Sequence, residues 1–134
     1  MKFNLIYLIF FLASFGFSDQ PAHPAKLIIK NNSQRTLDIK VMEQYGGTER
    51  RYSKFRVDNY DEHTEYFSNS GNYFLKIKAS IPGKDPLYTK GNPFKVYVGD
   101  DGYSELTITY TLKESNSPNP VEGKRINKIE FEKD

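Results

Sequence analysis

The chain carries one histidine among carboxylates, and this is the group of residues best suited to chemistry. In the segment Asp61-Glu62-His63-Thr64-Glu65, the side chains of Asp61, His63 and Glu65 share one face if the segment forms a strand. An imidazole between two carboxylates suits a general base with its orienting partner, or three ligands of a metal ion. No fourth ligand is in view, and a solvent-exposed strand start carries the same polar residues without any function.

The motifs of nucleophilic enzymes are missing from the sequence. The chain has no cysteine, which excludes thiol catalysis, and no Gly-x-Ser-x-Gly elbow positions a serine. A serine could work with His63 only through an unknown tertiary contact. We therefore expect a protein that is not an enzyme, with no catalytic residues and no cofactor. A small hydrolase or metal-binding protein that uses His63 is the alternative.

Three further acidic residues gather at a predicted hairpin turn. Asp100, Asp101 and Glu105 lie within Gly99-Asp100-Asp101-Gly102-Tyr103-Ser104-Glu105. A calcium-binding loop instead requires ligands at alternating positions before its glycine, and Asp and Gly tolerate the backbone angles of a tight turn without any ion. These three residues are weak metal-ligand candidates, and we expect no metal site.

The first eighteen residues differ in composition from the rest of the chain. Lys2 is followed by an apolar block from Leu5 to Phe17, and the small residues Gly16 and Ser18 precede the polar Asp19. This pattern is typical of a secretory signal peptide, with cleavage near Ser18/Asp19. A membrane anchor is the alternative, but the block is shorter than the ~20 apolar residues of a membrane-spanning helix. We expect a secreted or periplasmic protein with no transmembrane segment after cleavage.

The net charge after removal of this leader is close to zero. Lys2 is lost from 19 basic residues and all 17 acidic residues remain, so 18 basic residues face 17 acidic ones and the net charge is +1. Such a charge gives no long-range attraction to nucleic acid, and we expect no nucleic-acid partner. Because the chain has no cysteine, core packing alone must hold the domain together.

From Lys26 almost to the C-terminus, apolar and polar residues alternate with a period of two, which predicts β-strands. The clearest strand places Tyr73, Leu75 and Ile77 on one face. Turn-forming Gly, Asn and Pro residues separate the strands at intervals of about ten residues. The pattern predicts an all-β protein, an antiparallel β-sandwich of seven to eight strands, with a small β-barrel as the alternative.

The same pattern divides the chain into four parts. They are a signal peptide over 1–18, a mobile N-terminal arm over 19–25, the sandwich domain over 26–114, and a linker with a possible extra C-terminal strand over 115–134. That extra strand is expected from Ile126 to Phe131. The segment from Pro82 to Pro93 is rich in proline and is predicted to be a loop.

Two short stretches resemble a known group of proteins. Ser70-Gly71-Asn72-Tyr73-Phe74-Leu75-Lys76 places Gly-x-Tyr at the start of an alternating strand, and Asn31-Asn32-Ser33-x-Arg35-Thr36 precedes another. Over residues 26 to 112 the chain resembles the small secreted immunoglobulin-like and transthyretin-like β-sandwich modules of bacterial envelopes. The resemblance implies a fold and no active site, because sandwiches of this kind host many functions.

Tyrosines and lysines are the candidate partner-binding residues. Four tyrosines fall in predicted turns or loops, where recognition sites are common. They are Tyr45, Tyr60, Tyr88 and Tyr103. Four lysines fall opposite the apolar faces of their strands. They are Lys40, Lys76, Lys78 and Lys95. A basic outer face could receive an acidic glycan or a phosphate-bearing surface, whereas the simpler interpretation is that exposed lysines prevent aggregation between sheet edges.

The leading expectation is an exported, non-enzymatic β-sandwich that binds or docks to an envelope or extracellular partner, either a protein or a glycan. The expected binding residues are Tyr88, Tyr103 and Asp101 on two loops, with Lys76, Lys78 and Lys95 as a second surface. One further alternative is a structural subunit that assembles by adding its C-terminal strand to the sheet of a neighbour.

Overall fold

The computed structural model describes residues 2–14, 23–115 and 124–134, with side chains for 23–112 and 124–134. Within these ranges lie β1 (Lys2–Ser14), β2 (Ala25–Asn31), β3 (Thr36–Tyr45), β4 (Thr48–Val57), β5 (Glu62–Phe67), β6 (Gly71–Ser80), β7 (Leu87–Lys90), β8 (Phe94–Val96), β9 (Val98–Gly99), β10 (Gly102–Ser115), β11 (Lys124–Arg125) and α1 (Lys128–Glu132).

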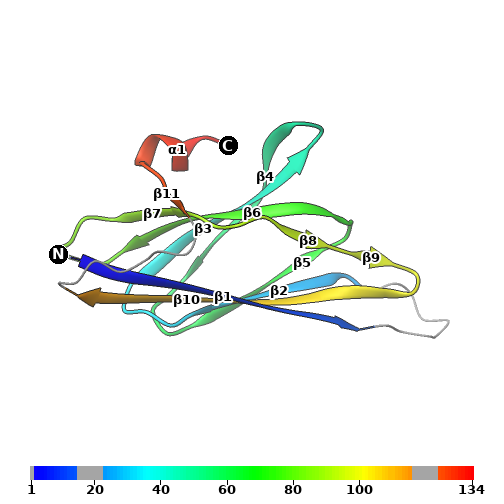
Figure 1. Cartoon of the computed structure of the whole chain (residues 1–134), viewed down its shortest axis with the longest axis horizontal. Coiled ribbons are helices and arrows are strands. Elements are labelled where there is room, and N and C mark those ends of the chain that lie inside the picture. The colour runs from blue at the N-terminus through cyan, green and yellow to red at the C-terminus, as the bar shows by residue number, and fades with distance from the viewer. Residues whose placement is uncertain (1, 15–22, 116–123) are drawn as a thin grey trace.

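The strands form two sheets that pack face to face (Figure 1). Sheet A has the order β1-β10-β2-β5, with β9 paired to β10, and sheet B has the order β11-β7-β6-β3-β4, with β8 paired to β6. Neighbouring strands run antiparallel, except that β10 runs parallel to β2. The prediction of an all-β sandwich is confirmed, and the described strands form two separate sheets rather than the alternative barrel.

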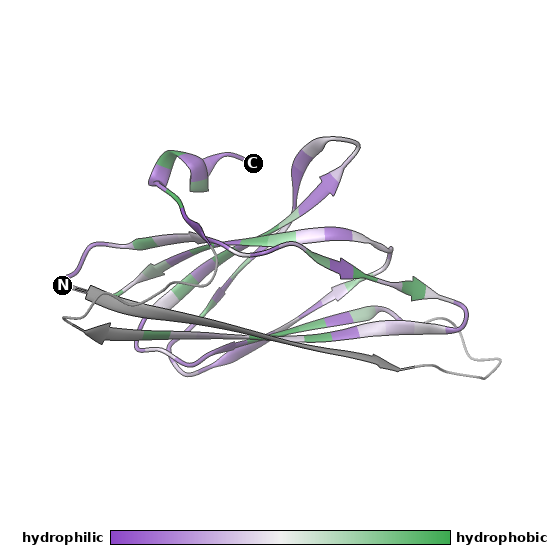
Figure 2. Ribbon diagram, viewed as in Figure 1, coloured by the Kyte–Doolittle hydropathy of each residue, from purple (hydrophilic) through white to green (hydrophobic). Residues whose placement is uncertain are grey.

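The hydrophobic core lies between the two sheets and consists of the alternating apolar residues. In β6, Tyr73, Leu75 and Ile77 point inward and are at most 1% exposed, and Leu27 and Ile29 of β2 belong to the same buried cluster. Figure 2 shows the resulting alternation of hydrophobic and hydrophilic residues along the strands. Removal of this apolar surface from water stabilises the fold by roughly 25 cal/mol for each Å².

Strand β1 covers most of the segment for which the sequence predicts a signal peptide. Its backbone pairs antiparallel with β10, from Lys2 opposite Ser115 to Ser14 opposite Tyr103. The expected cleavage point between Ser18 and Asp19 lies outside the described residues. The leader therefore stays a prediction, and β10 has a neighbour on each side in the full chain.

Two boundaries differ from the prediction. Ala25 was expected in a mobile arm but begins β2 and is fully buried, while residues 19–22 lie outside the described part. The predicted loop from Pro82 to Pro93 contains β7, which pairs with β6 over four residues. A strand so short fits between Pro86 and Pro93 because the ladder needs backbone N–H groups only between them.

The prediction of an extra strand from Ile126 to Phe131 is wrong. Part of this segment is α1, which begins after Asn127, and the Asn127 side chain accepts a hydrogen bond from the backbone N–H of Glu130 at 2.8 Å. This cap satisfies an N–H group that a helix start otherwise leaves unpaired. The segment rests on its own sheet B, so the feature that suggested assembly by strand addition is not there. No helix in the described ranges has the length and apolar character needed to cross a membrane.

Candidate functional site

Five lysines form a row across the outer face of sheet B. Each lies directly opposite the next on a neighbouring strand, in the order Lys54, Lys40, Lys76, Lys90 and Lys124. The strands are β4, β3, β6, β7 and β11 in that order. Like charges in directly opposite positions repel each other, so this lysine row needs negative groups above it.

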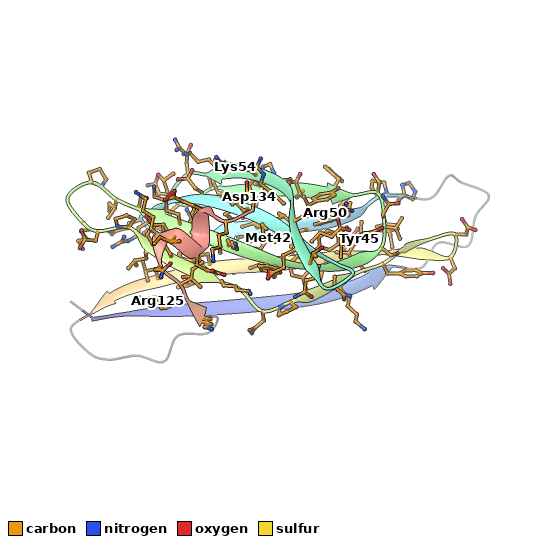
Figure 3. All side chains as sticks on the ribbon, turned by 90° about the horizontal axis from the view of Figure 1, so that it is seen from above. Met42, Tyr45, Arg50, Lys54, Arg125 and Asp134 are labelled. Carbon is orange, nitrogen blue, oxygen red and sulfur yellow. The ribbon has the colours of Figure 1, made fainter. Side chains whose placement is uncertain are left out.

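The C-terminal segment supplies such groups to Lys40. The Lys40 Nζ donates hydrogen bonds to the carbonyl oxygen of Phe131 at 3.0 Å and to the Asp134 carboxylate at 2.7 Å, and Lys40 is only 6% exposed. Figure 3 shows α1 and Asp134 above this face of the sheet. The hydrogen bond from Lys40 lowers the pKa of the Asp134 carboxyl below its ordinary value of 3.8.

Lys76 is held by the same segment through backbone oxygens. Its Nζ donates to the carbonyl oxygens of Glu130 at 2.9 Å and Lys133 at 2.7 Å. Carbonyl groups at the end of a helix carry partial negative charge, which makes them good partners for an ammonium group. Burial lowers the pKa of Lys76 below its ordinary value of 10.5, and the nearby Glu130 opposes this change.

Phe131 fixes α1 to the sheet. It is 7% exposed, its ring centroid lies 5.5 Å from that of Tyr88, and the Lys40 Nζ lies 4.9 Å from the same centroid. An ammonium group over an aromatic face is attracted by the ring. Tyr88, which the sequence suggested as a partner-binding residue, therefore packs against the chain's own C-terminal segment.

The hairpin between β3 and β4 covers the other part of this face. Gly46 and Gly47 have φ values of +56° and +84°, as a two-residue hairpin turn requires. Beyond the turn, the Glu49 carboxylate lies 3.9 Å from the Nζ of Lys90, which itself lies 4.6 Å from the ring centroid of Phe74. Because Glu49 is on β4 and Lys90 is on β7, the hairpin must reach across the outer face, and Figure 1 shows it on the same side as α1.

A pocket of about 230 Å³ lies beside α1 on this face. Its lining residues are Asp38, Ile39, Lys40, Lys54, Arg56, Lys78 and Phe131. Four of them are cationic and one is anionic. Arg56 Nε lies 3.0 Å from the Asp38 carboxylate, whereas the side chains of Lys54 and Lys78 have no hydrogen-bond or ion-pair partner among the described residues. We refer to this site as the cationic pocket.

The structure separates the predicted binding residues. Lys78 lines the cationic pocket, and Lys76 lies nearby but is only 3% exposed, so its predicted place on an open surface is wrong because α1 covers it. Lys95 is exposed on β8, opposite Asn72 and away from the pocket. Tyr88 lies beneath α1.

The other two predicted residues lie at the far end of the sandwich, at the turn between β9 and β10 (Figure 1). Tyr103 is half-buried, and its ring centroid lies 5.5 Å from that of His23. Asp101 accepts a hydrogen bond from the Tyr97 hydroxyl at 2.5 Å, which raises the pKa of Tyr97. Tyr103 and Asp101 therefore form no common surface with Tyr88.

The weak metal candidates Asp100, Asp101 and Glu105 are not assembled into a ligand set. In the part of the chain that the structure describes, no group of three His, Asp or Glu side chains is placed to hold a metal ion.

His63 lies in β5, close to the Glu65 carboxylate and to the Phe55 ring. Its Nε2 is 4.0 Å from the Glu65 carboxylate and makes no hydrogen bond, and its ring stacks on Phe55 with centroids 4.0 Å apart. The Ser53 hydroxyl donates to Glu65 at 2.6 Å, and so is not directed at the imidazole. Asp61 lies in the turn before β5, where its carboxylate accepts from the backbone N–H of Glu62.

Sequence reasoning missed Lys54 and Arg56 as site residues. Both alternate with apolar residues in β4, but the sequence does not show that β4 lies next to β3, and only that pairing places Lys54 opposite Lys40. The pattern Asn127-x-x-Glu130 was the available signal for α1, since a cap residue followed by Glu three positions later is typical of a helix start.

No family model, no curated protein and no solved structure matches the chain. Its class is therefore defined by the fold alone, a two-sheet β-sandwich whose outer face on sheet B carries a cationic pocket.

Proposed function

We propose that this protein is an exported, non-enzymatic β-sandwich that docks to an acidic polymer of the envelope or of the extracellular space through the cationic pocket. The observation that carries the proposal is the excess of cations in the pocket, where the side chains of Lys54 and Lys78 have no partner among the described residues while Lys40 and Arg56 are paired. Two ammonium groups that line the same pocket can bind carboxylate, sulfate or phosphate groups through charge-assisted hydrogen bonds.

The surroundings of the pocket favour a polymer over an isolated small ion. Lys90 and Lys124 continue the lysine row onto β7 and β11, and Arg51 on β4 lies 3.3 Å from the Asp134 carboxylate. A repeated acid can contact several of these cations at once and gains affinity from each release of bound counterions.

One sequence feature supports export, and one structural feature supports the absence of catalysis. Lys2 and the apolar block that follows it match a secretory leader. The hydroxyl of Ser53 is bonded to Glu65 rather than to His63, so in this arrangement His63 does not activate the Ser53 hydroxyl as a nucleophile.

The proposal is tested by measuring binding of the purified protein to dextran sulfate, with uncharged dextran as the reference polymer. We expect binding that weakens with salt, and a loss of affinity of about tenfold in the double variant Lys54→Ala/Lys78→Ala. The matched control is Lys26→Ala/Lys95→Ala, which removes the same charge away from the pocket and should change affinity less than about twofold.

Two results would contradict the docking function. One is an absence of binding to dextran sulfate at low ionic strength. The other is an equal loss of affinity in both double variants, which would mean that overall charge and not the cationic pocket attracts the polymer.

A further inference from the structure

A second surface lies at the turn between β4 and β5, which holds a tyrosine in an unusual backbone conformation. The N–H of Asp61 donates to the carbonyl of Asp58 at 3.1 Å and closes this turn. Tyr60 has φ +56°, which makes it the one non-glycine residue with positive φ in the described part of the chain. An L side chain is sterically disfavoured there, and Tyr60 is 63% exposed, so burial of its ring does not compensate.

The turn that carries Tyr60 is fixed from below by a buried amide. Asn31 is 2% exposed, and its Nδ2 donates to the carbonyl oxygens of Val57 at 3.3 Å and Asp58 at 3.0 Å, while its backbone N–H donates to the carbonyl of Asp61 at 2.9 Å. These bonds hold both ends of the turn. The exposed ring of Tyr60 is therefore presented from a rigid base, and a ligand that contacts it loses little freedom in ordering it.

Two pockets include Tyr60 in their lining. One has a volume of about 300 Å³ and is lined by Gln34, Arg35, Tyr60 and Leu112. The other has a volume of about 570 Å³ and is lined by Lys30, Asn31, Asn32, Tyr60, Asp61, Glu62 and Thr109. Tyr60 is the residue that the two pockets share, so a ligand that fills both contacts Tyr60.

The chemistry of the two pockets suits a saccharide. An exposed aromatic ring offers an apolar face against which the C–H groups of a sugar ring can lie. The carboxylates of Asp61 and Glu62, the amide of Asn32 and the hydroxyl of Thr109 can accept from or donate to sugar hydroxyl groups. A peptide that docks through apolar anchors would instead require a predominantly apolar pocket.

We infer that Tyr60 is the stacking platform of a second binding site, which takes a neutral oligosaccharide. The charges of the two pockets select the class of sugar. Asp61 and Glu62 in the larger pocket balance Lys30 there and Arg35 in the smaller one, so the combined lining has no excess of positive charge to attract an acidic sugar. This inference is independent of the proposed docking through the cationic pocket, which attracts anions.

The test is a titration of the ¹⁵N-labelled protein with cellotetraose, mannotetraose and the N-acetylglucosamine tetramer, followed by backbone amide shifts. We expect one of the three to shift amides in residues 31–35 and 58–62. Tyr60→Ala should weaken that binding by about tenfold or more, whereas Tyr60→Phe should keep it within about twofold, since it retains the ring. Thermal unfolding of each variant shows that it is folded.

Tyr45→Ala is the matched control, because Tyr45 is 60% exposed on a different hairpin. It should leave the titration unchanged. The inference is overturned if none of the three tetrasaccharides shifts these amides at millimolar concentration, or if Tyr45→Ala weakens binding as much as Tyr60→Ala. Loss of dextran sulfate binding has no bearing on this result, so the two sites fail separately.

Discussion

Lys40 and Lys76 lie directly opposite each other on β3 and β6, and both ammonium groups donate hydrogen bonds to the C-terminal segment that crosses above them. Removal of a hydrogen-bond partner costs far more free energy when the charge is buried than when the charge is exposed. The C-terminal segment is therefore part of the electrostatic balance of sheet B, and its attachment can be tested residue by residue.

Replacement of Phe131 by alanine is expected to release α1 while the sandwich stays folded. The Phe131 ring contacts Tyr88 and Lys40, and its loss should weaken the attachment by about 1–3 kcal/mol. Amide hydrogen exchange at residue 131, whose N–H bonds to Asn127, should become faster without a change in β6. Ile129→Ala is the control, because Ile129 is 72% exposed on the same helix. Equal acceleration in both variants would show that the aromatic contact is not the anchor.

Acid should loosen the same attachment through Asp134. The hydrogen bond from Lys40 gives Asp134 a pKa below 3.8, so the carboxylate's contribution is present above pH 3.8 and is lost as the pH falls through the lower, folded-state pKa. Protection of the α1 amides against exchange, corrected for the intrinsic pH dependence of exchange, should therefore fall on acidification below pH 3.8. Asp134→Asn should show the faster exchange already at neutral pH and a weaker dependence on acid. An unchanged pH profile in that variant would count against the assignment.

Alkali should unfold the protein through its buried tyrosines. Burial raises the pKa of Tyr73 from 10.0 to about 12, with Glu43 adding to the effect, and burial also raises the pKa of Tyr110. Below pH 10 these tyrosines are protonated in both the folded and the unfolded protein, and their contribution to the free energy of unfolding is fully present. The free energy of unfolding falls as the pH rises from 10 toward 12. Tyr110→Phe should flatten this fall in urea unfolding at a series of pH values. Tyr66→Phe changes an exposed ring and should leave the slope as it is.

The backbone of Tyr60 predicts a gain of stability on substitution. Glycine adopts positive φ without steric cost, so Tyr60→Gly should raise the free energy of unfolding by about 0.5–1 kcal/mol after the larger entropy of glycine in the unfolded chain is subtracted. Tyr60→Ala retains Cβ and should show no such gain. Urea unfolding of the two variants measures the difference, and equal stabilities would mean that the turn relaxes to another conformation.

The strands with regular alternation could be predicted from the sequence, because one buried face imposes a period of two. The alternation of Tyr73, Leu75 and Ile77 predicts β6, and the structure places these residues in the core. The short elements could not be predicted from hydrophobic periodicity. Strand β7 has four residues and α1 has five, so neither contains enough turns or alternations to reveal a period.

The candidate site could be predicted only in part, since it depends on strand order. The sequence shows that Lys78 lies opposite the apolar face of its strand, and in the structure Lys78 does line the cationic pocket on the outer face. It does not show that β3 lies between β4 and β6, which is what brings Lys54 and Lys78 to one pocket. The sequence places Tyr60 in a loop together with three other tyrosines, but it does not distinguish Tyr60 from them, because its φ value and the pockets beside it are properties of the folded turn.

The parallel pairing of β2 with β10 sets the order in which the domain can fold. Lys26 pairs with Glu105, which follows it by 79 positions (105 minus 26), whereas the β3–β4 and β6–β7 partners are close in sequence. Contacts between distant residues slow folding, to about milliseconds to seconds in sandwiches of this kind. A chain that emerges N-terminus first can form the hairpins of sheet B early. It cannot join β2 to β10 until nearly all of the domain has emerged. For the exported protein proposed above, this delay would keep the chain unfolded for much of its passage through a translocation channel.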